Sequence, residues 1–411
     1  MVLYIDPGTG SMLFTILIGI IGTGYFLLRS VIIKIKFIFR GGKVRDVEDK
    51  KIPVVIFSDH KRYWNVFEPI CNEFEKMGKE LVYMTASPDD PALDIEYKYV
   101  KPMFIGEGNK AFAKLNILNA YIVLSTTPGL NVYQWKRSKN VDYYLHILHS
   151  AGNASFYRMF GLDFYDGVLL SGEFQKNQIR RLEELREESP KELEYVGIPY
   201  FDELRKRVEE YDNKKQKNKK TVLVAPTWGK NGILSRYGAD FLNNIQKSEC
   251  NIIVRPHPQS FISEKQMIDD LMKEFPECDS FKWNKDNDNF SALMESDILI
   301  SDYSGVIYEY FMIFDKPIIY THPDIDLSPY DAYCLDEPPI IFELFSELGL
   351  ELNEENYGQV DNMIEECLSN PKYKEGRRKA SERLWLHKGE GTKRTVDYIL
   401  NKYNELKLKK A

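Results

Sequence analysis

Short apolar runs alternate with amphipathic segments along most of the chain. Such alternation, with helical patterns between the runs, is typical of parallel sheets whose two faces are covered by helices. The runs that we expect to be strands are Ile52–Phe57, Leu81–Thr85, Tyr121–Ser125, Val141–Leu148, Gly167–Leu170, Thr221–Ala225, Asn251–Val254, Ile298–Ser301 and Pro317–Tyr320. The segments expected to be helical are Asn65–Glu80, Asn109–Ala120, Glu173–Glu188, Ala239–Lys247, Ser263–Phe275, Phe290–Ser296, Val306–Phe314, most of Leu344–Ser369, and Thr392–Lys407.

One segment interrupts this rhythm. Asp212–Lys220 contains five lysines and no large apolar residue, which is typical of a solvated linker. The sequence therefore predicts two α/β domains, an N-terminal one at 51–205 and a C-terminal one at 206–390, followed by a C-terminal helix at 391–411. In such folds ligands bind beyond the carboxyl ends of the strands, so we expect a cleft between the domains.

Residues 1–50 follow a different pattern. Pro7–Leu28 carries no charged residue over 22 positions, and about 20 apolar residues suffice to span a bilayer. Six cations then precede the next acid, Asp46, which places this end of the segment on the cytoplasmic side. We expect a membrane anchor with a basic collar, a single pass and cytoplasmic catalytic domains. An interfacial helix is the main alternative; a cleaved signal peptide fits poorly because no basic residue precedes the apolar run.

Composition narrows the possible functions. The formal net charge is −7, from 55 Lys+Arg and 62 Asp+Glu, which argues against a general nucleic-acid binder. The five cysteines form no CxxC pair, so neither a disulfide framework nor a zinc site is expected. Neither a P-loop nor a dinucleotide fingerprint is present. The acidic runs 286–288 and 324–326 are typical of surface loops, so we predict no metal and no cofactor.

Two of the six histidines lie where a parallel strand would deliver them to the cleft. His149 follows the run Val141–Leu148, and His257 follows Asn251–Val254 within Arg255-Pro256-His257-Pro258. An arginine beside a histidine suits a diphosphate, because arginine offers a planar fork of donors and histidine a donor or a proton. The other histidines are interpreted as structural: His60, His146, His322 and His387.

The segment 298–314 (ILISDYSGVIYEYFMIF) predicts a strand, a turn and a helix. Asp302 or Ser304 can cap this helix, whose free amides, including that of Gly305, would suit phosphate oxygens. Glu309 lies in the second helical turn, where its carboxylate could accept ribose hydroxyls. Thr227, at the end of another strand and next to Trp228, could bind a phosphate or a base.

Together these segments resemble the CDP-glycerol glycerophosphotransferases of teichoic-acid synthesis. The resembling pieces are LHS at 148–150, VGIPYFDEL at 196–204, VAPTW at 224–228, RPHP at 255–258 and SDYSGVIYEYFMIFDKPIIY at 301–320. The resemblance implies two Rossmann-like domains of the GT-B type, with the nucleotide donor in the C-terminal one. It also implies transfer of glycerol phosphate from CDP-glycerol to a hydroxyl of a lipid-linked acceptor, with release of CMP.

The resemblance implies roles for individual residues as well. His149 matches the family's candidate base, and His257 matches a histidine at the donor phosphates. Arg255, Asp302, Ser304 and Gly305 would then bind the diphosphate, and Thr227 and Glu309 the nucleotide.

The sequence departs from the family pattern at two places. The usual His-Gly-Thr-Pro reads His149-Ser150-Ala151-Gly152, and the usual Asp-Tyr-Ser-Ser has Gly305 in place of its last serine. Two alternatives therefore stay open: a nucleotide-sugar glycosyltransferase for capsule or wall polysaccharide, and a membrane scaffold without activity. The sequence does not indicate an oligomeric state.

Overall fold

The computed structural model describes residues 51–211, 219–286, 288–322 and 325–409. The predicted membrane anchor, the basic collar and most of the predicted linker lie outside these residues. Within the described ranges, no helix combines the length and the apolar character that crossing a bilayer requires.

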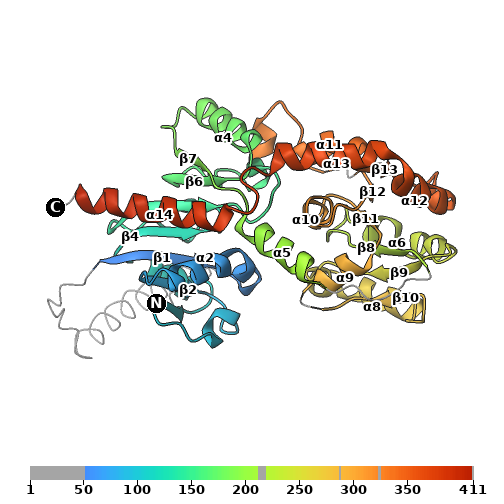
Figure 1. The fold of residues 1–411 in the computed structure, drawn as a ribbon, viewed down its shortest axis with the longest axis horizontal. Helices are drawn as coiled ribbons and strands as arrows, with labels where there is room; N and C mark the ends of the chain where they lie inside the picture. Colours follow the sequence, from blue (N-terminus) through green and yellow to red (C-terminus); the bar gives the residue numbers. More distant parts are fainter. Residues whose placement is uncertain (1–50, 212–218, 287, 323–324, 410–411) are drawn as a thin grey trace, which may run out of the picture. The chain divides into compact units, whose positions relative to one another are not determined.

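Residues 52–411 form one compact unit that contains two parallel sheets (Figure 1). The strands of the first sheet lie in the order β3-β2-β1-β4-β5-β6-β7. They are β1 (Ile52–Ser58), β2 (Leu81–Thr85), β3 (Val100–Phe104), β4 (Ala120–Ser125), β5 (Val141–Ile147), β6 (Gly167–Leu170) and β7 (Glu192–Tyr195). The strand order reverses between β1 and β4, as in doubly wound α/β folds.

The second sheet has the order β10-β9-β8-β11-β12-β13. Its strands are β8 (Thr221–Val224), β9 (Asn251–Val254), β10 (Phe281–Trp283), β11 (Ile298–Ser301), β12 (Ile318–Tyr320) and β13 (Gly349–Glu351). Its order reverses between β8 and β11, and all its strand pairs are parallel. The predicted α/β class with two sheets is therefore confirmed.

Helices connect most successive strands and cover the sheets, whereas a loop without a helix joins β4 to β5. The α-helices are α2 (Trp64–Lys76), α3 (Asn109–Leu115), α4 (Glu173–Leu185), α5 (Pro199–Glu210), α6 (Ile233–Ile245), α7 (Ser260–Ser263), α8 (Lys265–Glu274), α9 (Phe290–Glu295), α10 (Val306–Ile313), α11 (Ile340–Leu348), α12 (Val360–Ser369), α13 (Pro371–Leu384) and α14 (Gly391–Leu408). Short 3-10 turns include η1 (Lys61–Tyr63), η3 (Ala154–Phe156) and η4 (Asp331–Cys334).

The last helix returns to the first sheet. Figure 1 shows α14 in red beside β4, and Tyr403 on α14 packs its ring 5.2 Å from that of Tyr121 on β4. The helix also contacts β5, where the Tyr143 hydroxyl lies 2.9 Å from that of Tyr398. The C-terminal helix thus completes the core of the first sheet. The domain boundaries after residues 50, 205 and 390 stay predictions.

The two halves of this unit also share buried contacts. Ala151 and Phe174, from the first half, lie in one hydrophobic cluster with Phe311 and Trp385. Because these apolar side chains exclude water together, the loops that follow the two sheets are held by packing.

The prediction that Leu344–Ser369 is largely helical is confirmed by α11 and α12, but the short strand β13 and a loop separate the two helices. Gly349 ends α11 and starts β13, and a Cβ added there would lie 1.7 Å from the carbonyl oxygen of Ile318. Only glycine lets β13 approach β12 this closely. Strands β3, β7 and β10 were not predicted; β3 and β7 are edge strands, and their patterns are obscured by Pro102 in β3 and by the exposed Glu192 and Glu194 in β7.

Candidate functional site

The candidate residues follow the strands at which each sheet order reverses, or their direct neighbours. His149 comes after β5, which pairs with β4, and His257 comes after β9, which pairs with β8. Thr227 follows β8, and Asp302 follows β11. In open parallel sheets, ligands bind beyond the carboxyl ends of the strands at such reversal points. The topology therefore groups the predicted residues at the two edges where binding is expected.

His149 is half-buried and held at one ring nitrogen. Its Nδ1 lies 3.2 Å from the Thr126 hydroxyl and 3.2 Å from the Tyr157 hydroxyl. The ring of Tyr63 lies against it, with centroids 5.1 Å apart. Neither hydrogen bond uses Nε2, so this nitrogen remains available for a ligand.

The positive charge of one arginine, Arg62, lowers the pKa of both candidate histidines. Burial, followed by the positive charge of Arg62, lowers the pKa of His149 to about 4. Burial and then the same Arg62 charge also lower the pKa of His257. The Arg62 guanidinium lies over the Tyr63 ring, 4.8 Å from its centroid, and forms no ion pair with the residues described. An exposed cation near two neutral imidazoles favours an anionic ligand.

The small residues after His149 serve packing between the two halves. Ala151 is fully buried, and a Cβ on Gly152 would lie 3.1–3.2 Å from the ring and hydroxyl of Tyr308 on α10. The Asn153 side chain accepts a hydrogen bond from the Ile340 amide at 2.9 Å. The close neighbour of Gly152 is thus the side chain of Tyr308.

The free ring nitrogen of His257 is a hydrogen-bond donor, whereas a base needs a nitrogen with a free lone pair. The Gln259 amide donates to its Nδ1 at 3.1 Å, which leaves the proton of the neutral ring on Nε2. The turn is anchored by the Arg255 amide, which donates to the Val224 carbonyl at 2.8 Å, and the Arg255 side chain bonds the Asn284 side chain. The loop therefore presents a neutral N–H donor beside a guanidinium.

Asp302 lies wholly inside the protein. Its carboxylate accepts from the amides of Thr227 at 2.9 and 3.0 Å, Tyr303 at 2.7 Å and Ile233 at 3.3 Å. Burial raises its pKa to about 6, although these amide bonds oppose the rise. These hydrogen bonds join the loops after β8 and β11 through the Asp302 carboxylate, and the contact of Asp302 with a diphosphate stays a prediction.

Ser304 and Gly305 lead directly into α10, but Gly305 occupies the N-cap position and no side chain caps the helix there, so the predicted cap by Asp302 or Ser304 was wrong. Gly305 is exposed with φ −56° and ψ −24°, and nothing lies within 4 Å of an added Cβ. Its backbone is therefore one that any residue can adopt. Glycine here is not required by the fold.

Glu309 lies in α10 and accepts a hydrogen bond from the Asn289 amide group at 2.8 Å. Burial raises its pKa to about 7, with the Asn289 bond and the Arg255 charge acting in the opposite direction. Arg255 and Glu309 are thus electrostatic neighbours, which fits a single binding region at the end of β9 and the start of α10.

Sequence reasoning missed Arg62, Tyr63, Thr126 and Tyr157. Arg62 and Tyr63 follow β1, and Thr126 follows β4. These are the two strands between which the order of the first sheet reverses. Their positions at strand ends could have identified them. Tyr157 carries no such signal, because it reaches His149 from the loop after η3.

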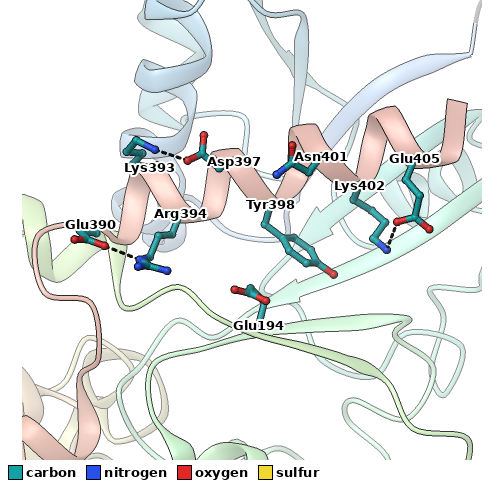
Figure 2. A pocket seen from close by; sticks show the side chains of 9 residues that line it. All are labelled: Glu194, Glu390, Lys393, Arg394, Asp397, Tyr398, Asn401, Lys402 and Glu405. Atoms are coloured by element: carbon teal, nitrogen blue, oxygen red, sulfur yellow. Dashed lines mark hydrogen bonds and ion pairs between the residues drawn. The ribbon is translucent and has the colours of Figure 1, made fainter. Parts of the chain in front are cut away.

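A cavity of 510 Å³ lies elsewhere, along α14 and Glu194 of β7 (Figure 2). Most of its charged side chains pair with one another along α14: Arg394 with Glu390 at 2.6 Å, Lys393 with Asp397 at 2.5 Å, and Lys402 with Glu405 at 2.8 Å. Figure 2 marks these pairs with dashed lines. None of the predicted site residues lines it. In the described parts of the chain, no His, Cys, Asp and Glu side chains group as a metal site.

Comparison with solved structures shows which fold this is. The chain resembles MnaA of S. aureus, solved with UDP, with a TM-score of 0.58 and 12% identity over 86% of this chain and 97% of the other. It also resembles a UDP-N-acetylglucosamine 2-epimerase from Rickettsia bellii (TM-score 0.54, 15% identity, 87% and 98% covered). The glycosyltransferase VinC, in complex with DTDP, matches with a TM-score of 0.51 and 10% identity over 86% and 99%. The parallel-sheet α/β fold of the GT-B type is confirmed.

Sequence comparison identifies relatives. A teichoic acid ribitol-phosphate polymerase, TarL of Staphylococcus aureus, is 30% identical over 41% of this chain and 30% of its own length. A teichoic acid poly(glycerol phosphate) polymerase of Bacillus spizizenii is 32% identical over 27% of this chain and 28% of its own length. These alignments thus cover about a third or less of each relative. Residues 163–401, more than half of the chain, match the CDP-glycerol:poly(glycerophosphate) glycerophosphotransferase family, and the chain belongs to this family.

Proposed function

We propose that this protein transfers glycerol phosphate from CDP-glycerol to a hydroxyl of a lipid-linked acceptor, releasing CMP, in the synthesis of teichoic acid or a related wall polymer. One observation carries the proposal. His149 and His257 follow strands next to the points where the strand order of each sheet reverses. The charge of Arg62 lowers the pKa of both histidines. Membership of the family supports the same reaction.

In the proposed reaction His149 is the base. Its Nε2 takes the proton of the acceptor hydroxyl while the oxygen attacks the β-phosphorus of the donor. The bond between this phosphorus and the bridging oxygen breaks, and CMP leaves. Catalysis then rests on positioning and electrostatic stabilisation, as in other phosphoryl transfers.

The second half of the protein would hold the donor. The Nε2–H of His257, the guanidinium of Arg255 and the amides at the start of α10 are donors suited to diphosphate oxygens. Ser304 would add a hydroxyl, and Thr227 and Glu309 would bind the nucleotide. Asp302 acts through the backbone of the Thr227 loop, whose amide it holds.

We also propose that the N-terminal segment anchors the enzyme in the cell membrane, with its catalytic part in the cytoplasm. A lipid-linked acceptor would then be presented at the same surface. The cations between residues 29 and 45 would strengthen the attachment to anionic lipids, each by about 1 kcal/mol.

A second donor is supported by a specific observation. Two of the curated relatives are ribitol-phosphate polymerases, TarL and TarK of Staphylococcus aureus. Ribitol phosphate would undergo the same chemistry at the same histidines, so the alternative changes the donor and leaves the reaction class unaltered.

The test combines binding and turnover on the full chain in membranes. Thermal stabilisation by CDP-glycerol is compared with that by CDP-ribitol, UDP-sugars and GDP-sugars, because a ligand that binds only the folded state raises Tm. Labelled CDP-glycerol then reports CMP release and the lipid product. Stabilisation by UDP- or GDP-sugars alone would favour a glycosyltransferase. Stabilisation by CDP-glycerol without CMP release, with acceptor present, would indicate a scaffold.

Restoring the missing serine is expected to tighten donor binding. Gly305→Ser fits without a clash and adds a hydroxyl beside the proposed diphosphate. One hydrogen bond contributes about 0.5–1.5 kcal/mol, so KM for CDP-glycerol should fall about two- to tenfold. Gly305→Ala is the matched control, since it adds the Cβ alone. Equal KM values for the two variants would show that the hydroxyl does not reach the donor.

Removing the Arg62 charge is expected to move the acidic limb of the kcat/KM profile to higher pH. The cation disfavours the protonated form of His149, whose pKa is about 4, so Arg62→Gln raises that pKa and the base is lost at a higher pH. Arg62→Lys keeps the charge and should leave the limb in place. The shift should shrink in 1 M salt, because Arg62 is exposed. An identical limb in both variants would contradict the assignment.

A further inference from the structure

A hydrogen-bonded chain lies behind the proposed base. His146, on β5 and fully buried, places its Nε2 3.0 Å from the Tyr157 hydroxyl. The same hydroxyl lies 3.2 Å from His149 Nδ1, which is also 3.2 Å from the Thr126 hydroxyl. Tyr157 therefore bridges two histidines, one of which sequence analysis left among the structural residues.

The bridging hydroxyl has a single hydrogen to share. Burial raises the pKa of Tyr157 well above its usual value, so the phenol stays protonated. Burial also lowers the pKa of His146 and of His149, so both rings are neutral at neutral pH. Tyr157 can donate to one ring and accept from the other, which leaves two arrangements of protons.

The two arrangements have different chemical consequences. If Tyr157 donates to His149 Nδ1, the proton of His149 is on Nε2, and this nitrogen can only donate to a substrate. If Tyr157 donates to His146 Nε2, it accepts from His149 Nδ1–H, and Nε2 of His149 carries the free lone pair. Only the second arrangement allows His149 to take a proton.

We propose that His146, through Tyr157, fixes the tautomer of His149 that is able to act as a base. This inference rests on the proposed function. His146 is a positioning residue: it provides the acceptor that directs the Tyr157 hydrogen away from His149. Similar outer partners fix the tautomer of metal-bound histidines and of the histidine in serine-protease triads.

The same hydrogen bonds also stabilise His149 after it has become positively charged. When Nε2 accepts the proton from the acceptor hydroxyl, His149 becomes an imidazolium, and Nδ1–H continues to donate to Tyr157 and Thr126. Tyr157 continues to donate to His146, so no proton moves along the chain and no group must reorient. Preorganised dipoles of this kind stabilise developing charge without a reorganisation cost.

Several charged or titratable groups face the hydrogen-bonded residues His146, Tyr157 and His149. These groups must stay unchanged in the variants that test the proposal. Arg62 and Tyr63 approach His149 from η1, and the charge of Asp59 acts on Tyr157. On its other side, His146 meets the ring of Tyr165 at a centroid distance of 4.8 Å. Among the described residues none hydrogen-bonds His146 Nδ1, which carries the ring proton when Nε2 accepts from Tyr157, so His146 connects to the site through Nε2.

The test compares His146→Leu with His146→Gln. Leucine removes the acceptor, whereas a glutamine carbonyl oxygen can replace Nε2. We expect His146→Leu to lower kcat about 10- to 100-fold with little change in KM for CDP-glycerol, and His146→Gln to recover most of the loss. Turnover in His146→Leu equal to that of the unmodified protein would overturn the proposal.

A double-mutant cycle separates this role from a structural one. In a Tyr157→Phe background the connection is already broken, so His146→Leu should cause no further loss of kcat. Equal losses with and without Tyr157 would show that His146 acts on the fold and would overturn the proposal. His149→Ala distinguishes the two hypotheses. If this variant retains turnover, the base assignment in the proposed function fails; if it is inactive while His146→Leu is fully active, only the tautomer role fails.

Discussion

His149→Ala is expected to lower kcat about 10²–10⁴-fold, which is the usual contribution of general acid–base catalysis. The loss should leave the fold intact, because the ring is only half-buried and its hydrogen bonds go to the Thr126 and Tyr157 hydroxyls, which can bind water instead. CMP release from CDP-glycerol in the presence of membranes measures the effect. Binding of CDP-glycerol should be nearly unchanged, since the proposed base acts on the acceptor.

The control for this prediction is a histidine that is not part of the proposed site. His387 has a φ of 54°, a conformation that asparagine tolerates, so His387→Asn removes an imidazole without backbone strain. We expect this variant to retain full turnover and an unchanged Tm. Undiminished CMP release by His149→Ala would exclude His149 as the base.

The second large effect is expected at His257. Because the Gln259 amide occupies Nδ1, the ring offers Nε2–H as a donor. Loss of one donor to a developing oxyanion typically costs about 10²–10³-fold in kcat, and we expect a loss of this size for His257→Ala. His257→Gln carries its amide N–H close to the position of Nε2 and should recover part of it.

The two histidines should differ in their pH behaviour. His149 must be neutral to accept a proton, whereas the neutral ring of His257 is already a donor, and burial together with the Arg62 charge favours that neutral form. The kcat/KM profile of His257→Gln should therefore keep its acidic limb. The residual activity of His149→Ala should show no such limb. Full recovery by His257→Asn, whose amide reaches the position of Nδ1, would contradict the proposed donor role of Nε2.

Most strands of both sheets could be predicted because they are buried on both faces and contain continuous apolar runs. Val54–Phe57 and Ile298–Ser301 are fully buried, and their residues match the predicted runs closely. The edge strands β3 and β7 and the short strand after Gly349 could not be predicted, since half-exposed or three-residue strands leave no periodic signal.

The positions of the site residues along the sheet edges could also be predicted from the sequence. A parallel strand delivers the residue after it to one edge of the sheet, so His149, His257 and Asp302 could be placed from the order of runs alone. What their side chains contact could not be predicted. Asp302 is directed into the protein by backbone amides, and the small residues after His149 receive Tyr308.

The sequence alone determined the α/β class, the two sheets and the strand ends that carry the candidate histidines. These features follow from local periodicity and chain order, which can be read one segment at a time. Only the tertiary structure decided which nitrogen of each histidine is free, because the partners of His149 and His257 come from turns whose positions depend on packing. It also brought the charge of Arg62 to both rings. Residues distant in sequence create these electrostatic effects, and no local pattern records them.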